Sequence, residues 1–306
     1  MKNEEIIRRV SDLKKEKNAV ILAHNYARAE VQDIADFVGD SFALSQAAVD
    51  LDADIIVFAG VRFMAESAFI LSPQKKVLLP DADAGCPMAD MITAEELQKA
   101  KEMYPNAAVV CYVNSSAAVK AQSDVCCTSA NAGEVVSSVS VDEILFIPDK
   151  NLGSYIASKT DKKVHLWNGY CPIHQQITEV DVFAAKAKHP NALFLAHPEC
   201  RPDVLKLADG IFSTAGIIKY AAASDHKEFI IGTEQEMMHK LQKDSPDKSF
   251  YPVSKYAYCA NMKMATLPAI LRALETENTV ITVPEEIRVK AKKSLDRMLA
   301  AVPKNR

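Results

Sequence analysis

The chain has 306 residues, 49% of them apolar and 25% charged, with a formal net charge of −4 at pH 7. This composition is typical of a globular protein of one to three domains and excludes a largely disordered chain. The charge gives no reason to expect nucleic acid or a membrane surface as a partner. No apolar run could span a membrane and the N-terminus has no apolar signal core, so we expect a cytoplasmic protein.

The first predicted elements alternate between short strands and helices. An apolar run at residues 20–26 suits a buried strand, residues 41–51 have a helical pattern, and residues 55–60 form a second apolar run. A helix over 64–71 and a strand over 76–80 follow. The resulting β-α-β-α-β order is typical of a small parallel sheet flanked by helices.

The same order occurs twice more along the chain. The second copy has strands at 109–114, 144–149 and 163–167 and helices at 130–139 and 152–159. The third copy has strands at 194–199, 229–234 and 249–253 and helices at 214–223 and 234–241. We therefore expect three homologous α/β/α sandwich domains with parallel sheets, at residues 1–88, 89–173 and 174–262, with C-terminal helices in 263–306 packing on the first.

Polar residues recur at matching places in the three copies. His24, Tyr112 and His197 end the first strands and lie 88 and 85 residues apart. A hydroxyl lies 17 residues after each of them, at Ser41, Ser129 and Thr214. A cysteine lies 62, 59 and 62 residues after them, at Cys86, Cys171 and Cys259.

Ligands bind at the carboxyl ends of strands in parallel α/β sheets, which is where these residues fall. Two positions after the first group lie Tyr26, Asn114 and Glu199. Three units around a pseudo-threefold axis would bring all of these side chains into one central active-site cavity. The hydroxyls fall near helix starts, where free N–H groups favour anions, although simple helix capping is an alternative.

The seven cysteines divide into two groups. Cys111 lies inside an apolar strand, Cys126 and Cys127 are adjacent, and Cys200 has no counterpart in the other units, so these four are interpreted as structural. The three that share a position in the repeat are interpreted as metal ligands. Three thiolates leave one position of a metal centre open, and in a [4Fe–4S] cluster, which normally has four cysteine ligands, that position is a free iron able to act as a Lewis acid.

Several segments, in order and over nearly the whole chain, resemble the quinolinate synthase family of bacterial NAD biosynthesis. They are residues 23–26, 39–41, 83–87, 112–115, 168–172, 197–200 and 213–216. Some members of that family carry a C-x-x-C-x-x-C run at the third ligand, whereas this chain has only Cys259 there.

The resemblance implies an oxygen-sensitive [4Fe–4S] cluster held by Cys86, Cys171 and Cys259. It implies the condensation of iminoaspartate with dihydroxyacetone phosphate to quinolinate, with loss of phosphate and two waters, and a functional link to the L-aspartate oxidase or dehydrogenase that supplies iminoaspartate. Tyr26, Glu199, His197 and His24 are then the catalytic candidates. The implied substrate-binding residues are His24, Ser41, Tyr112, Val113, Asn114, Ser129, His197, Pro198, Glu199 and Thr214.

Two other functions stay open at this point. A different [4Fe–4S] hydro-lyase could dehydrate a hydroxy acid at the same open iron. An iron–sulfur sensor or electron carrier is the non-enzymatic alternative, but such a role does not need a polar cavity with several acid–base groups.

Overall fold

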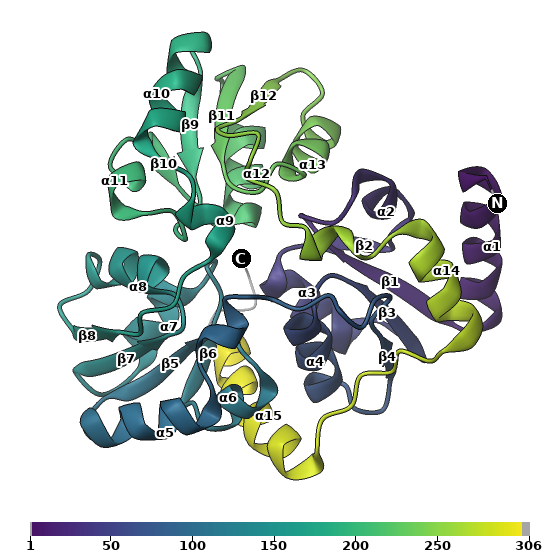
Figure 1. Ribbon diagram of the computed structural model, residues 1–306, viewed down its shortest axis with the longest axis horizontal. Helices are drawn as coiled ribbons and strands as arrows, with labels where there is room; N and C mark the ends of the chain where they lie inside the picture. Colours follow the sequence, from purple (N-terminus) through teal and green to yellow (C-terminus); the bar gives the residue numbers. More distant parts are fainter. Residues whose placement is uncertain (1, 302–306) are drawn as a thin grey trace.

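The structure, a computed structural model, describes residues 2–301. Within them the strands form three parallel sheets of four strands each, and Figure 1 shows the three units around a common centre. In each sheet the second strand of the unit along the chain lies at one edge, followed by its first, third and fourth strands. The predicted fold class is therefore confirmed. No helix among residues 2–301 has the length and apolar character that crossing a membrane requires.

Each unit alternates helices and strands in the same sequence. The first contains α1 (Asn3–Glu16), β1 (Ala19–His24), α2 (Ala29–Ile34), β2 (Phe37–Gly39), α3 (Ser41–Asp50), β3 (Ile55–Ala59), α4 (Arg62–Leu71) and β4 (Lys76–Leu78). The second contains α5 (Ala94–Met103), β5 (Ala108–Tyr112), α6 (Ala117–Ala121), β6 (Val125–Cys127), α7 (Ala132–Ser138), β7 (Glu143–Ile147), α8 (Lys150–Ala157) and β8 (Lys163–Leu166). The third contains α10 (Glu179–Lys188), β9 (Leu193–Ala196), α11 (Pro202–Leu205), β10 (Gly210–Ile211), α12 (Thr214–Ala223), β11 (Glu228–Gly232), α13 (Met237–Asp244) and β12 (Ser249–Pro252).

The remaining elements connect the units or follow the last one. They are the short helices η1 (Ala89–Met91), α9 (Pro172–Gln175) and η2 (Asn261–Lys263), and the C-terminal helices α14 (Leu267–Thr276) and α15 (Glu285–Ala300).

Each unit has a short helix and an edge strand that the sequence pattern did not predict. These are the pairs α2–β2, α6–β6 and α11–β10, inserted between the first strand of each unit and the helices α3, α7 and α12. The edge strands have only two or three residues, too few to show a periodic pattern. Each unit is therefore a four-stranded sheet rather than a three-stranded one.

The C-terminal helices pack on two different units. Helix α14 lies against α1 and β3 of the first unit, which is where the sequence placed the whole tail. Helix α15 differs from that expectation, because it packs mainly on α6 and β6 of the second unit and also touches α4 (Figure 1). Residues 302–306 of the expected tail lie outside the described part of the chain.

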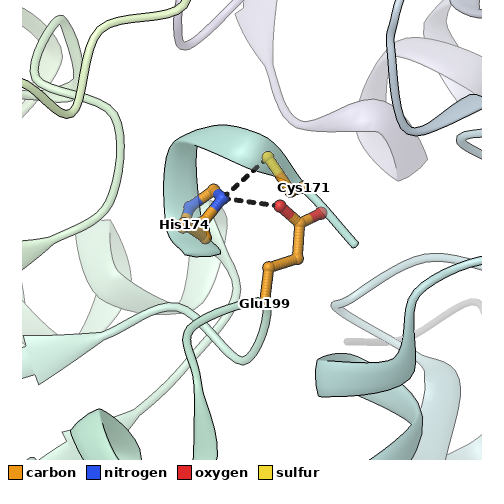
Figure 2. Close-up of side chains that lie close together, drawn as sticks. All are labelled: Cys171, His174 and Glu199. Atoms are coloured by element: carbon orange, nitrogen blue, oxygen red, sulfur yellow. Dashed lines mark hydrogen bonds and ion pairs between the residues drawn. The ribbon is translucent and has the colours of Figure 1, made fainter. Parts of the chain in front are cut away.

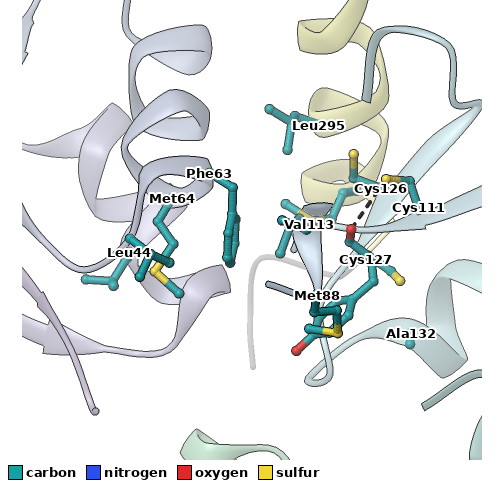
Figure 3. Close-up of a cluster of buried hydrophobic side chains, with 14 of the residues drawn as sticks. Leu44, Phe63, Met64, Met88, Cys111, Val113, Cys126, Cys127, Ala132 and Leu295 are labelled. Atoms are coloured by element: carbon teal, nitrogen blue, oxygen red, sulfur yellow. Dashed lines mark hydrogen bonds between the residues drawn. The ribbon is translucent and has the colours of Figure 1, made fainter. Parts of the chain in front are cut away.

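The largest apolar core is shared between units rather than confined to one. Figure 3 shows Phe63 and Met64 of the first unit opposite the second-unit cysteines, with Leu295 of α15 above them. Cys111, Cys126, Cys127 and Cys200 have no exposed surface, which agrees with the structural role predicted for them.

A lysine caps the C-terminus of the equivalent helix in all three units. Lys75, Lys162 and Lys248 each stand directly before the last strand of the sheet, and their ammonium groups donate to carbonyls at the C-terminal ends of α3, α7 and α12. The Nζ of Lys75 lies 2.9 Å from the Ala48 carbonyl oxygen. A cation at a helix C-terminus also complements the helix dipole.

Replacing any of these lysines by methionine should destabilise the fold, because the helix-end carbonyls lose their donor. We expect Lys75→Met, Lys162→Met and Lys248→Met each to lower the free energy of unfolding by about 1–3 kcal/mol in urea denaturation. Lys99→Met is the matched control, since Lys99 is exposed on α5. Equal losses in all four variants would contradict the capping role.

Candidate active site

A cavity of about 220 Å³ lies where the carboxyl ends of the three sheets meet. Almost every residue singled out from the repeat contributes to its wall. These residues are His24, Tyr26, Ser41, Cys86, Tyr112, Asn114, Ser129, Cys171, His197, Glu199, Thr214 and Cys259. Val113 and Pro198 are buried in two of the same loops, but neither is among the residues that line the cavity.

The three candidate ligand cysteines begin equivalent short turns. The sulfur of Cys171, which precedes α9, accepts the backbone N–H of His174. Backbone N–H groups of Met88 and Ala89 reach Cys86 in the same way, and those of Asn261 and Met262 reach Cys259. Such donors favour negative charge on sulfur.

Burial acts in the opposite direction on these thiols. It raises the pKa of Cys86 to about 12, and it raises the pKa of Cys171 and of Cys259 above the usual thiol range. Thiolates so disfavoured need a positive partner, and a metal centre deprotonates a coordinating thiol outright. The three sulfurs and their N–H donors therefore fit a group that takes three thiolates and leaves one position open.

His174 and Glu199 stand next to Cys171, as Figure 2 shows. The Nδ1 atom of His174 lies 3.2 Å from the Cys171 sulfur and 2.7 Å from a Glu199 carboxylate oxygen. The three donor atoms lie within 4.8 Å of one another. The sequence suggested only a supporting role for His174, three residues after Cys171, and gave no sign of its contact with Glu199.

Glu199 is the central anion of the cavity. Burial alone would favour its protonated form, but His174, His197 and the Tyr112 hydroxyl outweigh burial and hold the pKa of Glu199 below its usual range. The hydroxyl of Tyr112 donates to Glu199 over 2.5 Å. A carboxylate and two imidazoles thus share one buried corner of the site.

A chain of hydrogen bonds connects Tyr26 to that corner. The Tyr26 hydroxyl lies 2.5 Å from the Thr233 hydroxyl, which lies 2.8 Å from Nε2 of His174. Burial, followed by the charge of Glu199, raises the pKa of Tyr26 well above its usual value, so the phenol keeps its proton. Thr233 was not predicted from the sequence, although its place directly after β11 could have been noticed by comparing where the second predicted strand of each unit ends.

His24 and His197 are held as neutral rings of defined orientation. Burial lowers the pKa of each to about 3, and the charge of Glu199 opposes this only in part. Nδ1 of His24 accepts the Tyr26 N–H at 3.1 Å, and Nδ1 of His197 accepts the Glu199 N–H at 3.3 Å. The proton of each neutral ring is therefore on Nε2, and in His197 this atom lies 3.1 Å from the Ser129 hydroxyl.

The repeated hydroxyls are not the helix caps. Asp40 and Ser213 cap α3 and α12, so Ser41 and Thr214 are the first helical residues and line the cavity. The Thr214 hydroxyl is oriented by Asn25, whose amide donates to it over 3.1 Å. Helix capping, the alternative interpretation of these hydroxyls, therefore does not apply to Ser41 and Thr214.

The two depressed histidine pKa values predict that neither ring takes up a proton between about pH 5 and pH 8 in the folded protein. Nitrogen-15 NMR of the metal-free protein should show both rings with Nε2 protonated throughout this range. In urea the same two signals should titrate at about pH 6.5. A folded-state titration near neutral pH would show that the rings are not desolvated as described.

Comparisons with known proteins place the chain in a family. The model of the family described as "Quinolinate synthetase A protein" matches residues 8–300. The chain is 60% identical over 300 residues to Quinolinate synthase 1 of Methanosarcina acetivorans, covering 98% of this chain and 99% of that protein. It is 54% identical over 299 residues to the quinolinate synthase of Dehalococcoides mccartyi, with 98% and 99% covered.

A third relative, the quinolinate synthase of Thermodesulfovibrio yellowstonii, is 53% identical over 291 residues, with 95% of this chain and 96% of the relative covered. The match to the family model, over residues 8–300, extends through all three sheets. The chain therefore belongs to the quinolinate synthetase A protein family, a family of enzymes.

Proposed function

We propose that this enzyme makes quinolinate for NAD biosynthesis by condensing iminoaspartate with dihydroxyacetone phosphate, releasing phosphate and two waters. The observation that carries the proposal is the meeting of one cysteine from each unit with tyrosine, glutamate and histidine side chains in a single buried cavity. An aspartate-oxidising enzyme would have to supply the iminoaspartate.

Cys86, Cys171 and Cys259 would hold a [4Fe–4S] cluster. When bound, the cluster supplies a Lewis acid at the iron that no cysteine holds. The three thiols come from three units, so the cofactor would also join them. The other four cysteines are buried in the core and do not line the cavity, so they do not compete as ligands.

Neutral donors would bind the anionic substrates. The described residues that line the cavity include no lysine and no arginine, although the proposed substrates carry carboxylates and a phosphate. The hydroxyls of Ser41, Ser129 and Thr214 and the Nε2–H groups of His24 and His197 can donate to these anions. The Asn114 amide oxygen is buried without a protein partner, so it can accept from a substrate hydroxyl.

Tyr26 and Glu199 would transfer protons. The condensation requires imine formation, enolisation and two dehydrations, all of which move protons. Tyr26 retains its proton and can donate it, while the link through Thr233 to His174 offers a path for replacing it. Glu199 is an ionised carboxylate that can accept a proton, and Tyr112 and His174 hold it in place.

The first test concerns the ligands. Anaerobically purified protein should contain iron and sulfide, and Cys86→Ser, Cys171→Ser and Cys259→Ser should each lose most of both, because serine is a poor iron ligand. Cys200→Ser is the matched control: its buried sulfur donates to the Gly232 carbonyl, and a hydroxyl can do the same. Full iron and sulfide in a variant lacking all three cysteines would place the site elsewhere.

The second test concerns the chemistry. Tyr26→Phe and Glu199→Gln should keep the visible spectrum of the cluster yet lower quinolinate formation by about 10²-fold or more, the usual scale for a general acid or base. Tyr220→Phe removes a phenol that is not among the residues lining the cavity and should leave turnover unchanged. Near-normal turnover in both site variants would exclude them as proton carriers. A cluster without any quinolinate formation would instead point to a different hydro-lyase.

A further inference from the structure

Two buried carboxylates hold the backbone of two of the ligand cysteines. An Asp149 carboxylate oxygen accepts the N–H of Cys171 at 3.2 Å, and a Glu234 carboxylate oxygen accepts the N–H of Cys259 at 3.1 Å. Asp149 and Glu234 are both buried, and Glu234 also contributes to the wall of the cavity. Burying a carboxylate is costly unless its oxygens are well satisfied, so its presence calls for a specific role.

The two carboxylates occupy the same position of the repeat. Sheet pairing aligns Ala59, Ile147 and Gly232 at the ends of β3, β7 and β11. Two residues further along the chain are Val61, Asp149 and Glu234. The first unit therefore has an apolar side chain where the other two have an acid.

The cysteine loops return to this position in all three units. The N–H of Arg62, of Lys150 and of Gln235 donates over 2.8 Å to the carbonyl two residues before the cysteine of the same unit, at Ala84, Gly169 and Ala257. The first unit makes this contact with Val61 in place of the acid. The carboxylate is therefore not needed to close the loop against the sheet.

Other hydrogen bonds fix both carboxylates in place. The second oxygen of Asp149 accepts the N–H groups of Asn151 and Leu152 at 2.8 Å and so caps α8. Glu234 also accepts from Glu236 at 2.9 Å and from the Lys263 ammonium at 2.8 Å. Each acid thus forms hydrogen bonds both to the residues that follow its strand and to the N–H of a ligand cysteine.

We propose that Asp149 and Glu234 are positioning residues that set Cys171 and Cys259 in their ligand positions before metal binds. Cys86, with Val61 in place of an acid, is the ligand whose loop adjusts to the incoming metal. This inference rests on the proposed metal centre, but the positioning itself is a property of the metal-free chain. Metal-free protein can therefore test it separately.

The decisive variant is Asp149→Asn. Asparagine retains one oxygen to cap α8 but presents an amide N–H₂ to the N–H of Cys171, so only the contact with the cysteine is lost. Hydrogen exchange of the metal-free protein should become about tenfold faster or more at Cys171. The segment around Cys259 should be unchanged, and Glu234→Gln should give the converse pattern.

Asp124→Asn is the matched control. The carboxylate of Asp124 also accepts a backbone N–H in the second unit, that of Val109 at 2.8 Å, but at the opposite end of β5. This variant should speed exchange near Val109 and leave Cys171 unchanged. In loaded protein, iron should pass to a chelator faster from Asp149→Asn and Glu234→Gln than from Asp124→Asn or the unmodified chain.

Three results would overturn the proposal. Unchanged exchange at Cys171 in Asp149→Asn would show that the contact does not hold the ligand, and an equal increase in Asp124→Asn would show general loosening. Slower exchange around Cys86 than around the other two ligands in unmodified metal-free protein would contradict the adjustable role of its loop. Absence of iron from the unmodified chain would instead refute the proposed cluster, while the exchange results would still report on positioning.

Discussion

The direction of the strands is the constraint on which the site depends. All strands of a parallel sheet end at the same edge, so whatever follows them is brought together there. In this chain β1 pairs with β3, β5 with β7 and β9 with β11, and the three edges face one another. Residues as distant in sequence as Tyr26 and Thr233 thus come within 2.5 Å, with no long loop needed to carry either.

The scaffold is nearly symmetric, whereas the chemistry on it is not. The lysine caps, the strand order and the cysteine turns occur in every unit. The acid–base residues after the first strands differ, because Tyr26 and Glu199 can exchange a proton and Asn114 cannot. A substrate bound in the cavity would therefore contact three similar walls, of which only the first and the third carry a proton-exchanging residue at this position.

Spacing in the sequence predicted the parts of the site that repeat, and it could not predict the parts that occur once. The shared offsets of Cys86, Cys171 and Cys259 were visible because all three units retain them. His174 and Thr233 have no such counterparts, and their contacts with Glu199, with Tyr26 and with each other become visible only in the folded structure. Likewise β10, with two residues, carries too little pattern to be recognised, and the position of α15 depends on which apolar surface remains uncovered after the sheets form.

The C-terminal helices α14 and α15 complete the packing of the first two units. Helix α14 covers α1 near the beginning of the chain, and α15 covers α6 and β6 of the second unit. The N–H of Ile281 also donates to the carbonyl of Val77 in β4, at 2.8 Å. During synthesis on the ribosome, which proceeds from the N-terminus, the first two units thus remain without part of their apolar cover until α14 and α15 have been made. The residues that line the cavity extend from the first unit to Met262, so a metal centre that needs all three units cannot be assembled until the third unit has been made.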